Sequence, residues 1–307
     1  MRDQNHTQMP TGRDIPLLLI GIIGIGTSGP VIALSTMPIL ALIFWRNLGG
    51  ALSMLPFAIR HEFRLAKMNQ SQLRNPAYRK ALLWSALAGV TLAFHFVGFF
   101  IAMRYTTVAA GTALTALQPI FAAYFVKRLG GHIPRKAWIG MVISFLGVLV
   151  ITGVDFQISQ RAFLGDLAAI ACAALAALYV MLGSQAQKNL ATSTYTSICY
   201  LVCALTALPI ALISGVQIWG FNAREWWLLI ALIAGAQLLG HTMFNFALKR
   251  VSPAIVSLIV FFEVPVSAIL AYWWLDQLPP AGTIPGLVLL LLGCGIFVVR
   301  SKTSDKL

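Results

Sequence analysis

The sequence is poor in charged residues. Only 10% of its 307 residues are charged, nine of them acidic, whereas 59% are hydrophobic. Soluble globular proteins carry about 25% charged residues, so this chain has too few charges to cover a surface that faces water. Together with the mean hydropathy of +0.82, this composition predicts a membrane protein.

The sequence also lacks the motifs of enzymes and of metal- or nucleotide-binding proteins. It contains no GxxxxGK[ST], GxSxG or HExxH motif, and its nine acids form no cluster. His241 is the only candidate for an intramembrane general base, and no serine shares its helix face. The four cysteines lie in apolar runs without CxxC or Cys/His spacing, so we expect them to pack rather than bind metal. We therefore expect no enzyme, no catalytic residue, no metal and no cofactor.

Apolar segments of the length that crosses a bilayer, roughly 17 to 25 residues, occur ten times. They cover residues 16–35, 38–59, 80–102, 106–126, 134–152, 163–184, 194–214, 225–248, 253–274 and 281–299. With the N-terminus inside, 18 of the 22 Lys and Arg residues fall on the inner side; Arg104, Arg161 and Arg224 fall outside and Arg46 within a span. This bias predicts a multi-pass protein of the cell inner membrane with both termini cytoplasmic. The same bias explains the net charge of +13, because the basic residues lie where they face the anionic lipid surface. We therefore expect no nucleic-acid partner.

The two halves of the chain share residues at a constant offset. At 146 positions apart lie Gly89 and Gly235, His95 and His241, Arg104 and Arg250, Pro119 and Pro265, Pro134 and Pro280, Gly140 and Gly286, and Gly147 and Gly293. A duplicated unit of five spans has an odd number of crossings, so its second copy must enter the membrane from the opposite side. We therefore predict an all-α integral membrane protein of ten transmembrane helices in two inverted five-helix repeats, residues 1–152 and 153–307. The paired glycines predict that the fifth and tenth helices pack closely on a neighbouring helix, and each could be the other's neighbour.

Two charged residues lie inside predicted spans. Glu263 lies in VFFEVPVSAIL, two residues before Pro265, and Arg46 lies in ALIFWRNLGG. An ionised side chain at the centre of a span costs roughly 2.5 to 3.5 kcal/mol on insertion scales, so it normally faces a partner or a cavity. Arg46 and Glu263 could pair with each other, or Arg46 could cap backbone carbonyls. Alternatively, either residue could contact substrate, or Glu263 could exchange protons.

Other polar residues recur at helical spacing within the spans. The stripes are Gln237, His241 and Asn245; Thr91 and His95; and Thr112, Thr115 and Gln118. Such side chains commonly form hydrogen bonds between helices, but three stripes, two of them related by the repeat, favour a shared polar cavity. Pro30, Pro119 and Pro265 are expected to bend their helices and so permit gating.

Several segments resemble the drug/metabolite transporter superfamily, specifically its EamA-type transporters. They are FFIAMRYTTVAAGTALTALQPIFAAYFVKRL, AALAALYVMLG and FNFALKRVSPAIVSLIVFFEVPVSAILAYWWLDQL. The resemblance implies a central cavity walled by helices one, three, four, six, eight and nine. By that analogy the cavity residues are His95, Gln118, Tyr179, Gln237, His241, Asn245 and Glu263. The chain departs from the family in one respect: the Gly-Glu pair that commonly ends helices four and nine is replaced by Gly130-Gly131 and Asp276-Gln277.

These observations predict a secondary transporter, an exporter of small polar metabolites such as amino acids, that works by alternating access. Arg46 and the polar stripes would orient the substrate, and proton coupling through Glu263 or a histidine is a further hypothesis. The expected partners are the substrate and membrane lipids, and the protein is expected to be a monomer or homodimer. The alternatives are an importer or exchanger of another small metabolite, a channel, and a membrane protein without transport activity.

Overall fold

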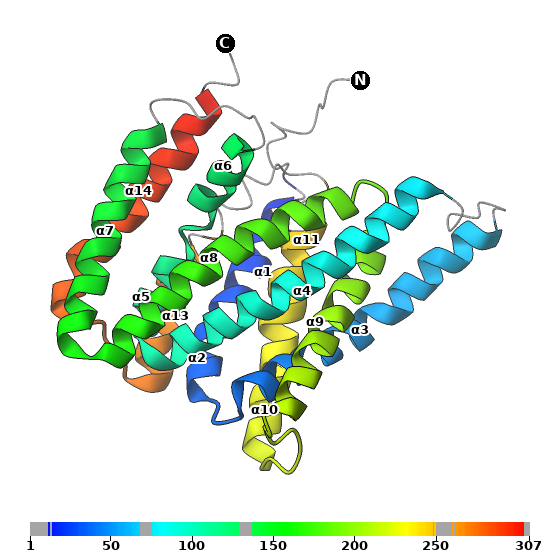
Figure 1. Cartoon of the computed structure of the whole chain (residues 1–307), viewed down its shortest axis with the longest axis horizontal. Helices are drawn as coiled ribbons and strands as arrows, with labels where there is room; N and C mark the ends of the chain where they lie inside the picture. Colours follow the sequence, from blue (N-terminus) through cyan, green and yellow to red (C-terminus); the bar gives the residue numbers. More distant parts are fainter. Residues whose placement is uncertain are drawn as a thin grey trace.

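The structure, a computed structural model, is built of helices packed side by side (Figure 1). It describes residues 12, 14–67, 75–128, 137–247, 249, 260 and 262–303, and these residues include no β-strand. Its helices are α1 (Asp14–Gly26), α2 (Ser28–Leu34), α3 (Ile39–Lys67), α4 (Pro76–Tyr105), α5 (Val108–Thr115), α6 (Gln118–Arg128), α7 (Ala137–Ile158), α8 (Gln160–Ala186), α9 (Thr192–Ile213), α10 (Ala223–Leu232), the π-helix η2 (Ile233–Thr242), α11 (Met243–Ala247), α13 (Glu263–Leu275), the 3₁₀-helix η3 (Ala281–Thr283) and α14 (Ile284–Thr303).

The described helices correspond to the predicted spans. Among the described residues, eight segments are long and apolar enough to cross a membrane, and residues 281–296 form a shorter apolar one. The span expected at 253–274 begins at residues outside the described part of the chain and continues as α13. The segments run along most of the length of the bundle, as membrane-spanning helices do.

Counterpart helices of the two halves contact each other. Between α3 and α9, the Ser197 hydroxyl donates to the Ala51 carbonyl at 3.5 Å. Between α7 and α14, the Ser144 hydroxyl donates to the Leu290 carbonyl at 3.3 Å. In both bonds the two residues are 146 positions apart, which is the offset of the sequence repeat. Equivalent positions of two copies can meet only near the axis that relates them, so this pseudo-symmetry axis passes through both contacts.

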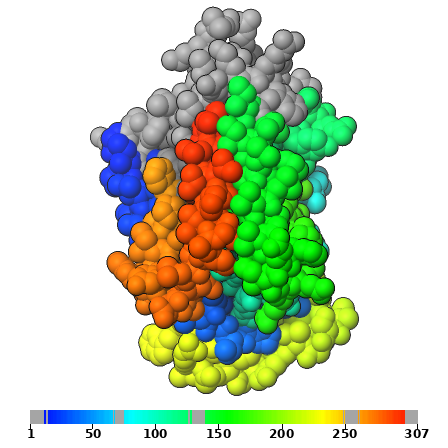
Figure 2. Space-filling model, turned by 90° about the vertical axis from the view of Figure 1, so that its left-hand side faces the viewer, coloured from blue at the N-terminus to red at the C-terminus, as the bar shows by residue number. Residues whose placement is uncertain are grey.

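Glycines allow α7 and α14 to approach at backbone distance. A Cβ atom on Gly147 would lie 2.5 Å from the Leu290 nitrogen and 2.7 Å from the Gly286 oxygen. A Cβ atom on Gly293 would collide with the Ser144 backbone nitrogen. The two helices lie side by side on the surface of the molecule (Figure 2). The close packing expected of the fifth and tenth helices is therefore a direct contact between them.

Prolines mark breaks in the spans. Helices α2 and α6 each begin after a one- or two-residue break in the span that contains them. Pro30 is the third residue of α2, Pro119 the second of α6 and Pro265 the third of α13. A proline fits the first turn of a helix because its missing N–H would have no acceptor within the helix there. Pro30 and Pro119 thus lie just after short interruptions of their helices, and the interrupting residues Thr27 and Ala116 keep near-helical dihedral angles.

Candidate functional site

A cavity of about 70 Å³ lies where the segments after the breaks begin. The first residues of α2, α6 and α13, which are Ser28, Gln118 and Glu263, all line it. The remaining walls come from α1, α4, α5, α8, η2 and α11. These elements correspond to spans one, three, four, six, eight and nine, and they include both halves of the chain.

The structure brings six of the eight predicted site residues together around this cavity. They are His95, Gln118, Tyr179, His241, Asn245 and Glu263. Arg46 and Gln237 do not line it; both are fully buried behind its wall. Contact of any of these residues with substrate stays a prediction.

Arg46 lies one side chain away from the cavity. Its Nε donates to Gln237 Oε1 at 2.7 Å and its Nη1 to Ser28 Oγ at 3.5 Å. The guanidinium lies 4.2 Å from the centroid of the Phe96 ring, a cation–π distance. Nη2 has no hydrogen-bond partner among the described residues. The structure places Arg46 in neither an ion pair with Glu263 nor a cap on backbone carbonyls, the two structural alternatives left open by the sequence.

Glu263 lines the cavity from the second half of the chain, with 6% of its surface exposed. Its carboxylate takes part in no side-chain hydrogen bond or ion pair within the described part of the chain. As the first residue of α13, it lies at the positive end of the helix dipole, where a negative charge is favoured. Glu263 therefore offers the cavity an acid without a bonding partner among the described residues.

Three other cavity residues, His95, Tyr179 and Asn245, are held by bonds between helices. His95 Nδ1 lies 3.1 Å from the carbonyl of Cys172, and Asn245 Nδ2 donates to the Tyr179 hydroxyl at 3.1 Å. When Nδ1 of His95 carries the proton, its Nε2 is an acceptor. The threonines of the predicted polar stripes instead form hydrogen bonds within their own helices. The hydroxyls of Thr91, Thr112 and Thr115 each donate to a carbonyl four residues earlier.

A π-helix separates Gln237 from the other two residues of its predicted stripe. The Thr242 hydroxyl donates to the Gln237 carbonyl, five residues earlier, within the π-helix η2. Because π turns are wider than α turns, a step of four residues no longer returns to the same face. Gln237 consequently faces Arg46 and donates to Asn47 Oδ1 at 3.2 Å, whereas His241 and Asn245 face the cavity.

The sequence matches the profile of the EamA-like transporter family twice, over residues 13–153 and 163–299. The chain belongs to the EamA-like transporter family. Two successive matches to one family, together with the helices described above, confirm the predicted fold of two five-helix repeats. They also establish the protein as a membrane transporter.

Named transporters are among the similar proteins. An uncharacterized transporter of Archaeoglobus fulgidus is 28% identical over 220 residues, which cover 71% of this chain and 74% of that protein. The pseudopaline exporter CntI of Pseudomonas aeruginosa is 26% identical over 274 residues, which cover 88% and 89%. One solved crystal structure has a TM-score of 0.65 at 17% identity, over 95% of this chain and 99% of that one. This last likeness shows a common fold alone.

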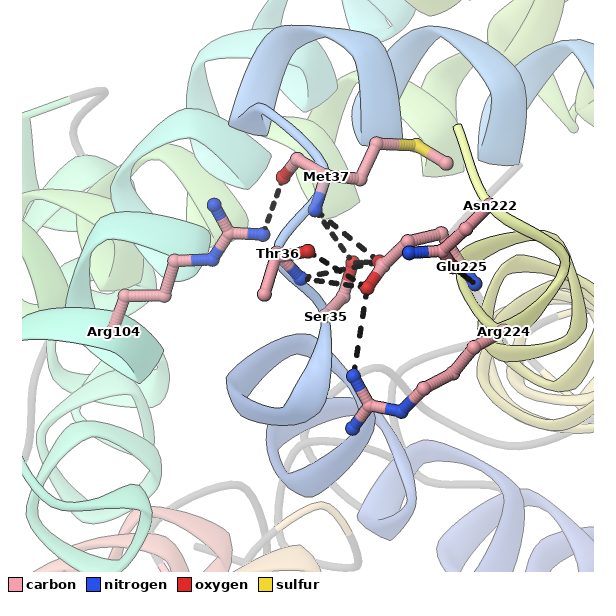
Figure 3. Close-up of polar contacts among 7 residues, drawn as sticks. All are labelled: Ser35, Thr36, Met37, Arg104, Asn222, Arg224 and Glu225. Atoms are coloured by element: carbon pink, nitrogen blue, oxygen red, sulfur yellow. Dashed lines mark hydrogen bonds and ion pairs between the residues drawn. The ribbon is translucent and has the colours of Figure 1, made fainter. Parts of the chain in front are cut away.

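At one end of this EamA transporter, a buried carboxylate holds a loop. We call this end, where the α2–α3 loop and the start of α10 meet at the bottom of Figure 1, the lower end. Glu225 accepts hydrogen bonds from Ser35 Oγ at 2.6 Å, Thr36 N at 3.1 Å, Thr36 Oγ1 at 2.9 Å and Met37 N at 3.2 Å (Figure 3). From the other side, Arg104 Nη2 donates to the Met37 carbonyl at 2.6 Å. We call these five residues the loop latch, and it ties the first half of the transporter to the second.

Sequence reasoning missed the loop latch. The sequence predicts Glu225 at the outer end of a span and Arg104 among the outer basic residues, and neither prediction connects the two. The spacing of Asn222 and Glu225 is that of a helix N-terminus, and Asn222 Oδ1 does accept from Glu225 N at 3.1 Å. That signal could have located the start of α10. It could not have identified Ser35 to Met37, some 190 residues away, as the partners.

The structure also gives a role to the residue pair at which the chain departs from its family. Gln277 Oε1 accepts a hydrogen bond from Val108 N at 2.9 Å, in the first turn of α5. The first four N–H groups of a helix have no acceptor within the helix. Gln277 therefore satisfies one of them and connects α13 of the second half to α5 of the first.

Proposed function

We propose that this protein exports a small polar metabolite, such as an amino acid, across the cell inner membrane by alternating access around the cavity. The observation that carries the proposal is the meeting of polar side chains from both halves at the starts of α2, α6 and α13. Discontinuous helices that meet at the interface of two repeats are a recurring feature of transporter substrate sites.

The charges around the cavity favour a substrate with both an amino group and a carboxylate. Glu263 has an unused acid, and Arg46 has an unused N–H behind the wall formed by Phe96 and Ser28. An arginine fork suits a carboxylate, and a carboxylate suits an ammonium group. A zwitterion spanning the cavity would complement both residues once the wall beside Arg46 opens.

The size of the cavity indicates a contracted state. Its volume of about 70 Å³ is well below the roughly 300 Å³ at which small-molecule sites begin. Substrate entry therefore requires the walls to move apart, and the breaks before α2 and α6 allow their segments to move separately. At the lower end the loop latch holds the two halves together, which supports a carrier that closes over its substrate and not an open channel.

Two observations support export as the direction. The pseudopaline exporter of P. aeruginosa is similar over most of the chain. The distribution of basic residues favours an orientation with the lower end outside the cell and both termini in the cytoplasm. The loop latch would then close the protein toward the outside until substrate from the cytoplasm has bound.

The test compares the metabolites in the medium of cells that express equal membrane amounts of wild type, Glu263→Gln, or the control Asp276→Asn. Asp276 is an exposed acid at the far end of the same helix, so its substitution removes an equal charge outside the cavity. We expect one metabolite to accumulate with wild type and the control but not with Glu263→Gln. Accumulation with all three would contradict a role for Glu263, and accumulation with none would contradict export.

Proton coupling through Glu263 or a cavity histidine is part of the proposal. Glu263 has no ion-pair partner in the described part of the chain, so it is free to exchange a proton with substrate or water. Vesicles that contain the purified transporter and the identified metabolite provide the assay. A pH gradient should drive uptake by wild type and not by Glu263→Gln; equal gradient-driven uptake by both would assign coupling elsewhere.

A further inference from the structure

A second group of buried acids lies at the lower end, away from the cavity. Thr106 follows the last residue of α4, Asp155 is in the last turn of α7, and Asp166 is in α8. The Thr106 hydroxyl donates to Asp155 Oδ2 at 2.8 Å. Asp166 follows Gly165, at which a Cβ atom would lie 2.8 Å from the Thr106 nitrogen, so α8 brings Asp166 beside the same turn. The exposed fractions of Thr106, Asp155 and Asp166 are 7%, 2% and 0% respectively. None of these residues lines the cavity.

This pair of acids has no counter-charge among the described residues. Neither carboxylate oxygen of Asp166 has a hydrogen-bond donor there, although both oxygens are buried. The basic residues on the adjoining elements are engaged elsewhere. Arg104 donates to the Met37 carbonyl, and Arg161 lies over the exposed Tyr105 ring and donates to the Arg104 carbonyl. Two neighbouring buried carboxylates without a cation are strongly unfavourable.

Four helix ends meet at this place. Thr106 caps the C-terminus of α4, and Asp155 lies in the C-terminal turn of α7. The C-terminal end of a helix carries a partial negative charge, and such ends help to hold Na⁺ or H⁺ in transporters. The N-termini of α5 and α8 begin at the same two turns and offset these partial charges. The charge that a cation would neutralise is therefore that of the two carboxylates, beside one hydroxyl.

We propose that Thr106, Asp155 and Asp166 form a site for one monovalent cation, either a proton shared by the two carboxyl groups or a sodium ion bound by their oxygens. The site spans the turn between α7 and α8, where the first family match ends and the second begins. Its occupant holds the C-terminal turn of α7 against α8, and its loss lets the two carboxylates repel. The cation thereby sets the angle between the two repeats.

The experiment measures the thermal unfolding temperature of the purified full-length protein in two titrations. One lowers the pH from mildly alkaline to mildly acidic without sodium; the other adds NaCl at alkaline pH, with choline chloride as the ionic-strength control. A ligand tenfold above its dissociation constant shifts the folding equilibrium about tenfold. We therefore expect the unfolding temperature to rise in the acid titration for a proton site, or in the sodium titration for a sodium site. All measurements use the Glu263→Gln background so that the cavity acid does not contribute.

Asp166→Asn and Asp155→Asn should each remove that response, while Asp276→Asn should retain it. Because asparagine resembles a protonated aspartate, Asp166→Asn should also be at least as stable as its parent at alkaline pH. A structural acceptor would instead be weakened by that change. No response of the parent to either cation, or an undiminished response in both asparagine variants, would overturn the proposal.

Infrared spectroscopy of the Glu263→Gln protein decides the question if the asparagine variants do not fold. A proton site requires the band of a protonated carboxyl group at neutral pH, and a sodium site requires a carboxylate band that shifts with Na⁺ but not with choline. Either signal supports the site. The absence of both overturns it.

Discussion

The loop latch makes a quantitative prediction for Glu225→Gln. Four donors of three residues converge on this carboxylate, at 2.6 to 3.2 Å. Glutamine keeps one acceptor oxygen but turns an NH₂ group toward hydroxyl and backbone N–H donors. About half of the bonds are lost, and a hydrogen bond to a charged group contributes roughly 1.5 to 3 kcal/mol. Two lost bonds weaken the latch by about 3 kcal/mol, which is roughly a 100-fold change in the equilibrium between a closed and an open lower end.

Cysteine labelling in intact cells measures this change. Ser28 lines the cavity above the latch, and the four native cysteines are buried, so Ser28→Cys provides a reporter with little background. A maleimide that does not cross membranes should label this cysteine much faster in the Glu225→Gln protein than in its parent. The rise should approach 100-fold if opening limits the reaction.

A matched control comes from the opposite end of α3. Glu62 accepts hydrogen bonds from the hydroxyls of Tyr78 at 3.0 Å and Thr194 at 2.8 Å, so Glu62→Gln also removes a bonded carboxylate. It should leave the labelling of Ser28→Cys unchanged. Equal labelling rates for Glu225→Gln and its parent would refute the latch as the closure of the lower end. A rise in both variants would show general loosening of the fold and refute the argument in the same way.

Two further predictions concern stability. Gly293→Ala should lower the unfolding free energy by about 1 to 3 kcal/mol, because the new methyl group meets the Ser144 backbone. The control Gly295→Ala, whose new methyl group has nothing within 4 Å, should raise the unfolding free energy by about 0.5 to 1 kcal/mol. Equal unfolding temperatures of the two variants would contradict the tight α7–α14 contact. Gln237→Leu should cost about 1.5 to 3 kcal/mol because it leaves the Arg46 Nε–H without its acceptor. Restoring the acceptor with Gln237→Glu should recover that loss, and failure to do so would contradict the assignment of this bond.

The fold was predictable because its signals are local or repeat along the chain. Apolar length defines the spans, and shared glycines, prolines and histidines at one offset define the duplication. Paired glycines such as Gly147 and Gly293 predict close packing of the fifth and tenth helices, because small residues at matched positions of two spans let backbones approach; that the partner of each is the other is known only from the structure. The cavity residues were found for a related reason. Glu263 and His241 are polar at depths where a polar side chain needs a partner or a cavity.

The remaining features depend on contacts between distant residues. The π-helix forms where η2 packs against α1, and a Cβ on Gly24 would lie 2.7 Å from the backbone of Gly240. No local pattern distinguishes that segment from an α-helix, so the four-residue spacing predicts one face for Gln237, His241 and Asn245, whereas in the structure Gln237 faces Arg46. The loop latch likewise joins Glu225 to a loop about 190 residues earlier. Its acid resembles an ordinary residue at the start of a helix until the fold is known.

The distribution of charge between the repeats connects the site to the transport motion. His95 and His241 are equivalents, but Arg46 corresponds to Thr192 and Glu263 to Leu117 at the same offset. The cation is therefore on the first half and the acid on the second. Any movement of one half against the other changes the separation between them, so a zwitterion that bridges both charges binds one arrangement of the halves better than another. A substrate can shift a conformational equilibrium only by such a difference in its affinity for the two states. Two charges on the same repeat would keep their separation during the movement, so they would give the substrate no such difference in affinity.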